Sequence, residues 1–476
     1  MQSKSYFKEI ALTLLPLALF SCNERNSKEE GKKNVLFIAV DDLRPELNCY
    51  GAEHIHSPNM DRLAMEGVQF TRAYCNIPVS GASRASLLTG TRPTYNRWVH
   101  HNDRIDEMLP DVPTIGKYFR DNGYHTVHNS KIMHHPGDAK GSWTEEWWPD
   151  CIGSWRNYAN PKNIQLDTTA SEKDPAYECY AVPDTAYKDG KTAMKAIQDL
   201  KRLKDQDKPF FLGVGFYKPH LPFNAPKKYW DLYDPAKIQF PEYQEKPLNA
   251  PDESMHNSGE LRAYRDIPPA GRLSDTMARN LIHGYYACVS YIDAQVGKVL
   301  NALDEMGLSE NTIVVLWGDH GWNLREHGLW CKHCNFETSL HAPLIIKDPD
   351  MKKGRQTDAV AEFVDIYPTL CELCNIGTPG HLEGESLLPV MKNPEGTTDG
   401  IAVSRWHEGT TIIDPPYFYT EWVDSTGKKQ VDMLYDHAED PKETVDISGN
   451  AEHKKLVEKL DESLRAHWGN FIDKAR

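Results

Sequence analysis

The sequence predicts an α/β protein, a layered sandwich built on a parallel sheet. Three apolar runs, at 34–40, 210–216 and 312–318, show no alternation of polar and apolar residues, which is typical of strands buried on both faces of a parallel sheet. Helical patterns separate these runs, notably Leu273 to Met306, a helix that we expect to end at Gly307. Strands that alternate with helices favour a layered sandwich.

The character of the sequence changes after about residue 390. Short β-rich pieces follow at 401–406, 417–423 and 430–436, and an amphipathic helix is expected around Ala451 to Trp468. We therefore expect a smaller, antiparallel C-terminal subdomain packed on the first domain.

The composition excludes one class of partner. The chain has 476 residues, 39% of them hydrophobic, and a formal net charge of -15, with an isoelectric point near 5.7. Nucleic-acid binding requires a basic face, so nucleic acid is not an expected partner. An anionic substrate would need a locally basic pocket.

The N-terminus has the pattern of an export signal. Lys4 and Lys8 precede the apolar run 10–20, which is too short to span a bilayer as a permanent helix. The stretch Leu19-Phe20-Ser21-Cys22 resembles a bacterial lipobox, although Phe20 is an unusual occupant. We expect a periplasmic or outer-membrane lipoprotein of a bacterium, bound to a membrane only through a lipid on Cys22. Ordinary secretion with cleavage nearby is the alternative.

Ten cysteines in an exported protein make disulfides possible. Cys151 and Cys179 flank a loop-rich segment and are the better candidate pair. Two C-x-x-C pairs, at 331–334 and 371–374, could suggest a zinc ribbon. The second pair lies in a helix-like stretch, however, so we interpret its cysteines as packing residues.

Polar residues follow all three predicted strands. The runs are followed by Asp41-Asp42, by Lys218-Pro219-His220 and by Asp319-His320. Ligands of such sheets bind beyond the carboxyl ends of the strands, so these side chains should converge at one edge. Three carboxylates and an imidazole favour a hard cation such as Ca²⁺ over Zn²⁺.

One motif identifies a family. Val79 to Gly90 contains S-x-A-x-R, from Ser80 to Arg84, followed by L-L-T-G. This pattern resembles the signature of the type I sulfatases, in which the first residue, Cys or Ser, is oxidised to formylglycine (3-oxoalanine). The resemblance implies that a sulfatase-maturating enzyme binds the chain transiently and modifies Ser80. On its own, Ser80 could equally cap a helix.

The resemblance covers nearly the whole mature chain, from N-V-L-F-I-A-V-D-D-L-R-P to L-Y-D-H-A-E-D-P-K-E-T. It is closest to the iduronate-2-sulfatases, through D-D-L-R-P-E-L-N-C-Y-G, K-I-M-H-H-P-G, K-P-H-L-P-F and G-D-H-G-W-N-L-R-E-H-G. It implies an alkaline phosphatase-like fold, an α/β/α sandwich with a large, mostly parallel sheet and a smaller C-terminal antiparallel sheet. The expected organisation is a lipoprotein-type signal peptide at 1–22, a polar tether at 23–33, a sulfatase catalytic domain at 34–390 and a C-terminal subdomain at 391–476.

The resemblance also implies roles for individual residues. One Ca²⁺ per chain would be bound by the modified Ser80 together with four strand-end residues, Asp41, Asp42, Asp319 and His320.

The remaining matches surround the sulfate. Arg84 would hold the formylglycine hydrate, and Lys131 and His134 would contact the sulfate and the hydrate. His220 and Lys332 would lie around the sulfate and its leaving oxygen. One hydroxyl of the hydrate attacks sulfur and the other later expels sulfate, a second step that is harder for an unmodified serine.

The expected substrate is a sulfated saccharide, with 2-O-sulfate on the uronic acid of a glycosaminoglycan fragment as the specific prediction. Candidates for binding the uronate carboxylate are Arg92, Arg97, His100 and His101.

Three alternatives remain open. Another sulfated sugar, such as an algal one, would use the same machinery. A phosphatase or phosphonate monoester hydrolase of the same superfamily would share the strand-end ligands. A lipoprotein that binds glycans without turnover would use aromatic platforms such as Trp147, Trp148 and Trp155.

Overall fold

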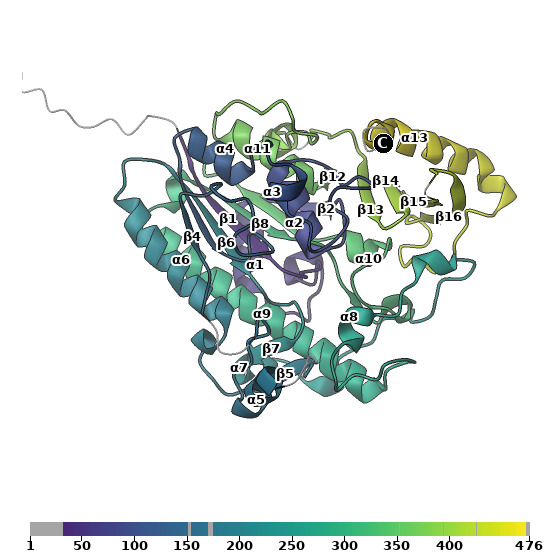
Figure 1. Cartoon of the computed structure of the whole chain (residues 1–476), viewed down its shortest axis with the longest axis horizontal. Helices are drawn as coiled ribbons and strands as arrows, with labels where there is room; N and C mark the ends of the chain where they lie inside the picture. The colour runs from purple at the N-terminus through teal and green to yellow at the C-terminus, as the bar shows by residue number, and fades with distance from the viewer. Residues whose placement is uncertain are drawn as a thin grey trace, which may run out of the picture. The chain divides into compact units, whose positions relative to one another are not determined.

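The computed structural model describes residues 32–150, 154–169, 175–351, 353–393, 395–424 and 426–472 (Figure 1). The predicted signal peptide, Cys22 and the tether up to residue 31 lie outside these residues, as does Cys151. Export, the lipid anchor and the Cys151–Cys179 disulfide therefore stay predictions. In the described part of the chain, no helix is long and apolar enough to cross a membrane.

A large mixed sheet of eight strands forms the centre of the fold. Strand β11 pairs antiparallel with both of its neighbours, and the remaining pairings are parallel. The predicted mostly parallel sheet is therefore confirmed. In spatial order the strands are β12 (Arg355–Glu362), β2 (Val68–Tyr74), β11 (Leu344–Lys347), β8 (Thr312–Gly318), β1 (Asn34–Val40), β6 (Phe210–Phe216), β3 (His125–Ser130) and β4 (Glu145–Trp147).

Helices cover both faces of this sheet (Figure 1). Leu36 and Ile38 of β1 belong to the core beneath one set of helices, and Val35 and Phe37 belong to the core beneath the other set. Alternate side chains of a strand point to opposite faces, so β1 must be apolar at every position. The first face carries α1 (Pro58–Glu66), α6 (Lys188–Lys204) and α9 (Asp275–Glu305), and the second carries α2 (Ser80–Thr89), α4 (Ile115–Asp121) and α11 (Ile366–Leu373).

The sequence located the central elements closely. The three apolar runs coincide with β1, β6 and β8. Helix α9 begins after Ser274, whose hydroxyl accepts a hydrogen bond from the backbone N–H of Met277, and it ends at Glu305. Gly307 follows in the left-handed conformation, with a φ of 67°.

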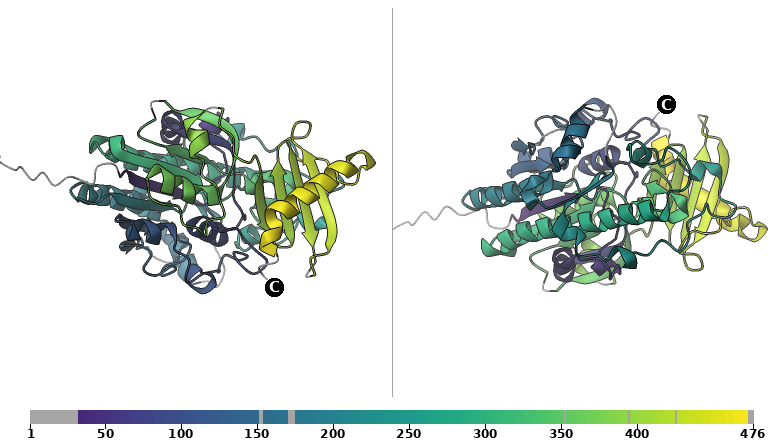
Figure 2. Two further views of the ribbon diagram at one scale, coloured as in Figure 1. Left: turned by 90° about the horizontal axis from the view of Figure 1, so that it is seen from above. Right: turned by 90° about the horizontal axis from the view of Figure 1, so that it is seen from below.

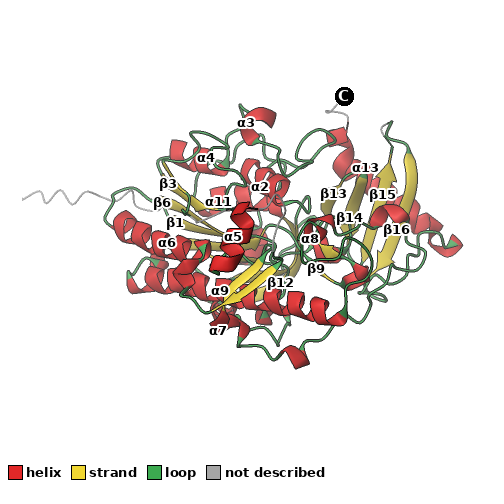
Figure 3. Ribbon diagram, turned by 60° about the horizontal axis from the view of Figure 1, so that its bottom comes forward, coloured by secondary structure: helices red, strands yellow, loops and turns green. Residues whose placement is uncertain are grey.

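The smaller C-terminal sheet is antiparallel throughout (Figure 3). Helix α13 (Lys454–Ile472) lies across one face (Figure 2). Its Leu460 and Leu464 are buried in a core cluster with residues of the strands. The sequence missed one of its four strands, Gly409–Asp414. These are β13 (Ala402–Trp406), β14 (Gly409–Asp414), β15 (Tyr417–Val423) and β16 (Lys429–Asp436).

The residues from 32 onward belong to one compact unit, and the domain boundary near residue 390 stays a prediction.

The remaining α-helices and β-strands of the described fold are short. They are α3 (Ile105–Met108), α5 (Pro161–Thr169), α7 (Lys227–Trp230), α8 (Gly259–Arg262), α10 (Glu337–Leu340), α12 (Leu388–Lys392), β5 (Tyr177–Tyr180), β7 (Phe223–Pro226), β9 (Asn323–Leu324) and β10 (Trp330–Cys331).

The cysteines of the two C-x-x-C pairs are buried. Cys371 and Cys374 pack in the core on the α11 side of the sheet, as predicted. Cys331 and Cys334 belong to two other core clusters. The four thiols are therefore dispersed among separate packing environments, and they do not form a zinc ribbon.

Candidate active site

The ends of β1 and β8 bring four predicted metal ligands together. Val40 pairs with Gly318 in the sheet, so Asp41-Asp42 and Asp319-His320 leave adjacent strands at the same level. The backbone N–H of Asp42 donates to Asp319 Oδ1 at 2.8 Å. The three carboxylates and the imidazole are wholly buried.

Asp42 is held in an unusual backbone conformation. Its φ of 58° lies in the left-handed region, which is costly for a residue with a side chain. The hydroxyl of Tyr285, on α9, donates to the carbonyl of Asp42 at 2.8 Å and accepts from the backbone N–H of Arg44 at 3.0 Å. Helix α9 thereby fixes the loop that carries the paired aspartates.

The donor set fits a hard cation. Ligand atoms of Asp42, Asp319 and His320 lie within 4.8 Å of one another. His320 Nδ1 lies 2.9 Å from the carbonyl of Gly321, which requires a proton on Nδ1 and leaves the Nε2 lone pair facing the cluster. Such a hydrogen bond from the distal nitrogen is usual for a metal-binding histidine. Burial raises the pKa of Asp319 to about 6, and a bound cation would stabilise its ionised form.

Ser80 is the first residue of α2 and lies on this cluster. Its Oγ is 3.0 Å from His320 Nε2, so the serine hydroxyl donates to the free lone pair of the imidazole. The packing behind Ser80 is tight, because a Cβ on Gly81 would lie 2.2 Å from the carbonyl oxygen of His101.

Arg84 projects from the same helix one turn later. Its guanidinium donates to Asp319 Oδ2 through Nε and to Asp41 Oδ1 through one terminal nitrogen, both at 3.1 Å, and to the carbonyl of Lys131. The structure thus shows Arg84 binding the buried carboxylates. Its role in holding a formylglycine hydrate stays a prediction.

Lys131 and His134 follow β3. Lys131 Nζ lies 2.7 Å from Asp41 Oδ2. Burial alone would raise the pKa of Asp41, but Lys131 and Arg84 hold it well below its ordinary value. Burial and the nearby Lys131 charge keep the pKa of His134 well below its usual range, so this imidazole is neutral.

His220 and Lys332 also lie close to the carboxylate cluster, next to Asp42. Lys332 Nζ donates to Asp42 Oδ1 at 3.0 Å and to Glu260 Oε1 at 2.9 Å. His220 Nε2 lies 3.2 Å from the same Glu260 oxygen. The sequence analysis missed Glu260, because it lies on the short helix α8 outside every recognisable motif.

These groups open into one cavity of about 770 Å³. Five of the predicted residues line it, namely Ser80, Lys131, His134, His220 and Lys332, and the metal-ligand candidates lie beneath them. The sequence analysis assigned no role to several other lining residues, among them Lys188, Tyr217, Glu260 and His333.

The candidates for sugar recognition separate into two groups. His101, Trp148 and Trp155 line the cavity. Arg92 and Arg97 do not, because their guanidinium groups bind Glu362 and Glu383 instead. His100 and Trp147 also lie outside the lining. Sequence proximity to the motif therefore misled the prediction for both arginines.

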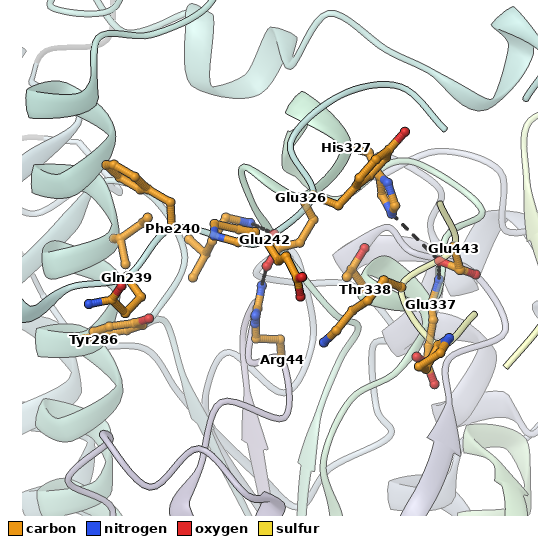
Figure 4. Close-up of a pocket in the computed structure, with 16 residues that line it drawn as sticks. Arg44, Gln239, Phe240, Glu242, Tyr286, Glu326, His327, Glu337, Thr338 and Glu443 are labelled. Atoms are coloured by element: carbon orange, nitrogen blue, oxygen red, sulfur yellow. Dashed lines mark hydrogen bonds and ion pairs between the residues drawn. The ribbon is translucent and has the colours of Figure 1, made fainter. Parts of the chain in front are cut away.

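A second cavity, of about 360 Å³, contains none of the predicted site residues (Figure 4). Arg44 donates to Glu326 Oε1 at 2.8 Å within it, and Glu242, Glu337 and Glu443 also line it. It lacks a nucleophile next to a cationic cluster, so we place the chemistry in the larger cavity.

Comparisons with known proteins agree with this geometry. The sulfatase family profile matches residues 33–376, and the profile of the C-terminal part of N-sulphoglucosamine sulphohydrolase matches residues 325–468. A sulfatase of Formosa agariphila is 32% identical over 480 residues, covering 94% of this chain and 90% of the relative. Human iduronate 2-sulfatase is 33% identical over 417 residues, covering 78% and 74%. The chain belongs to the sulfatase family, enzymes that hydrolyse sulfate esters.

Solved structures show the same fold. A protein in complex with its substrate D-glucosamine-2-N,6-O-disulfate has a TM-score of 0.73 at 21% identity, covering 92% of this chain and 98% of that one. The phosphonate monoester hydrolase of Agrobacterium radiobacter has a TM-score of 0.75 at 22% identity, covering 93% and 96%. The fold is therefore the alkaline phosphatase-like sulfatase fold predicted from the sequence.

Gly215 on β6 offers a test of how Lys131 is positioned. A Cβ at Gly215 would lie 2.0 Å from the carbonyl carbon of Lys131, so Gly215→Ala must displace this backbone. We expect kcat/KM for a sulfate ester to fall roughly a hundredfold, because displacements of this size misalign reacting groups. Gly380→Ala, where a Cβ meets nothing within 4 Å, is the control and should retain full activity. Equal activity of the two variants would contradict the assignment of Lys131 to the site.

Proposed function

We propose that this sulfatase removes 2-O-sulfate from a uronic acid of glycosaminoglycan fragments, using one Ca²⁺ and a formylglycine formed from Ser80. The observation that carries the proposal is the position of Ser80, which contacts His320 at the floor of the larger cavity between two lysines. The 33% identity to human iduronate 2-sulfatase supports the choice of substrate.

The charges of the site favour an anionic substrate once a metal is present. When ionised, Asp41, Asp42 and Asp319 are negative, and Arg84, Lys131 and Lys332 offset them at 2.7 to 3.1 Å. When bound, Ca²⁺ would supply the additional positive charge that stabilises sulfate oxygens and promotes ionisation of the nucleophile.

Side chains of the cavity would bind the sulfate, supply the nucleophile and protonate the leaving group. Lys131 and Lys332 both line the cavity and are suited to bind sulfate oxygens. His320, protonated on Nδ1, would bind the metal through Nε2, the atom that lies beside side chain 80. The formylglycine hydrate would supply the attacking hydroxyl and a second hydroxyl that later releases sulfate. His220, which also lines the cavity, would give a proton to the departing sugar oxygen.

The groups that would bind the carboxylate of an anionic saccharide differ from the arginines that the sequence suggested. Arg92 and Arg97 are bound to other residues. Of the three lysines that line the cavity in the described part of the chain, Lys188 is the one that we have not assigned to the sulfate. Its Nζ lies 4.6 Å from the centre of the Tyr217 ring. We assign Lys188 and His101 as the groups that would face the uronate carboxylate. Trp155, 40% exposed, offers an apolar surface to the sugar ring.

Two alternatives keep specific support. The fold is shared with a protein whose substrate is a sulfated glucosamine, so another sulfated sugar is a second candidate. It is also shared with a phosphonate monoester hydrolase, which keeps phosphonate or phosphate esters as a third candidate.

We further propose that the protein is exported and anchored through Cys22, and that a maturating enzyme modifies Ser80 before or during export.

The modification of Ser80 is directly measurable. Peptide mass analysis of active protein should show that residue 80 lacks two hydrogens, as formylglycine does. Ser80→Ala should be inactive, because alanine cannot be converted. Full turnover by protein with an unmodified Ser80 would contradict the mechanism.

Metal binding should depend on Asp319. Asp319→Ala should lose both calcium and turnover, because the two remaining carboxylates are already paired with Lys131 and Lys332. Elemental analysis should find one calcium per wild-type chain, and also per chain of Asp252→Ala, whose side chain is 98% exposed. Two zinc ions per chain would favour the phosphatase alternative.

The substrate proposal is tested with defined disaccharides. The matured enzyme should release sulfate from 2-O-sulfated unsaturated uronate disaccharides, and it should not act on 6-O-sulfated or N-sulfated glucosamine. Ion chromatography separates sulfate from phosphate in parallel assays with a phosphonate monoester. Desulfation of a hexosamine or galactose derivative, with no action on the uronate, would overturn the substrate but not the family.

A further inference from the structure

We propose that Glu260 is a positioning residue, which sets the His220 imidazole and the Lys332 ammonium at the oxygen that leaves sulfur. The proposal rests on the proposed function, since it takes from it the reaction and the side of the pocket where the sugar departs. Neither the sulfatase motifs nor the charge pattern of the sequence pointed to this glutamate.

One carboxylate oxygen contacts both donors. Glu260 Oε1 lies 2.9 Å from Lys332 Nζ and 3.2 Å from His220 Nε2. The Glu260 side chain is 14% exposed and the Lys332 side chain 5%. Burial would raise the pKa of Glu260, but Lys332 and His220 hold it well below its ordinary value, so the carboxylate is charged. A charged acceptor shared by two donors fixes the distance between them.

The other contacts of His220 leave Nε2 as the ring nitrogen that can donate a proton to the leaving group. Nδ1 lies 2.5 Å from the carbonyl of Leu221, so Nδ1 carries a proton and is committed to the backbone. The edge of the ring faces Trp155, with 5.3 Å between the ring centres. Nε2 then faces Glu260 Oε1, with Asp42 Oδ2 farther away at 3.9 Å.

Lys332 needs an acceptor outside the metal-ligand cluster. Its ammonium also contacts Asp42, at 3.0 and 3.1 Å, but Asp42 is a proposed ligand of the metal. A divalent cation on Asp42 would repel the lysine, and Glu260 is then the carboxylate that retains it. The Trp322 ring, 4.8 Å from Nζ, closes the other side.

Hydrogen bonds of the residues around Glu260 hold helix α8 next to the segment that carries Lys332. The hydroxyl of Ser258, next to α8, accepts from the backbone N–H of Trp330 at 3.1 Å, which ties α8 to the strand that precedes Lys332. Arg262 donates to the carbonyls of Asn257 and Pro268 at 2.7 and 2.6 Å. The segment that carries Glu260 is thus fixed to the segment that carries Lys332.

A metal-binding role for Glu260 is the competing interpretation. Ligand atoms of Asp42, His220 and Glu260 also lie within 4.8 Å of one another. Lys332 Nζ, however, bonds to both carboxylates of this set, so a cation placed there would face an ammonium group at contact distance. In the set that includes His320, Lys332 bonds to only one of the three residues, Asp42, and His320 faces the cluster with its unprotonated Nε2.

The chemical consequence concerns the leaving group. As the sulfur–oxygen bond to the sugar breaks, its electron pair stays on the sugar oxygen, which takes the Nε2 proton of the His220 imidazolium and becomes a hydroxyl, leaving a neutral imidazole. Sulfur meanwhile bonds to the attacking oxygen of side chain 80, whose hydroxyl proton has passed to solvent on ionisation of the hydrate. A sugar alkoxide is strongly basic and needs this help, whereas a nitrophenolate leaves readily without it. Misplacing the two donors should therefore slow sugar sulfates much more than aryl sulfates.

The experiment compares Glu260→Gln, Glu260→Asp and Glu260→Ala with the wild type. The substrates are a 2-O-sulfated uronate disaccharide and 4-nitrophenyl sulfate. Glu260→Gln keeps the shape but loses the charge, and it should lower kcat for the disaccharide roughly ten- to a hundredfold. The same variant should lower kcat for the aryl sulfate only a few-fold, and Glu260→Ala should widen the difference. Glu242→Gln, an exposed glutamate of the second cavity (Figure 4), is the matched control and should be unchanged with both.

The outcomes separate the hypotheses. An equal fall with both substrates would show a merely structural role, and no fall with either would show that Glu260 is dispensable; both overturn the proposal. Elemental analysis should find full calcium in Glu260→Ala, and its loss would make Glu260 a ligand instead. If the wild type hydrolyses neither sulfate ester, the proposed function itself fails, a result that does not depend on any Glu260 variant.

Discussion

The structure of the site depends on the burial of three carboxylates at the ends of two adjacent strands. Asp41, Asp42 and Asp319 are inaccessible to solvent, and ionised groups in such a place are costly unless they are paired. Arg84, Lys131 and Lys332 come from three different elements to meet this requirement. The cluster thereby fixes α2, the end of β3 and the β10 loop relative to one another.

This pairing connects the fold to the chemistry. The residues that neutralise the carboxylates also line the substrate cavity or hold the helix that begins with Ser80. A sulfate group entering the cavity would compete with the carboxylates for the same lysines. A metal bound to the carboxylates would resolve that competition, because it would release the lysines for the substrate.

The sequence was most informative where one physical requirement dominates. Strands buried on both faces must be apolar throughout, so β1, β6 and β8 were located to the residue. Strand β14 was missed because its mixed sequence, Gly409–Asp414, becomes a strand through its pairing with β13 and β15. The same limitation applies to Arg92, whose partner Glu362 is distant in the sequence. Glu260 could not be found either, because its importance follows from two contacts across the pocket.

The central claim is that a metal on the strand-end carboxylates makes the cavity receptive to sulfate. Isothermal titration of the wild-type protein with inorganic sulfate, with calcium present and with calcium removed by a chelator, tests it most directly. The account predicts that sulfate binds in the presence of calcium and that binding weakens at least tenfold, or about 1.4 kcal/mol, without it. Equal affinity under both conditions would contradict the claim.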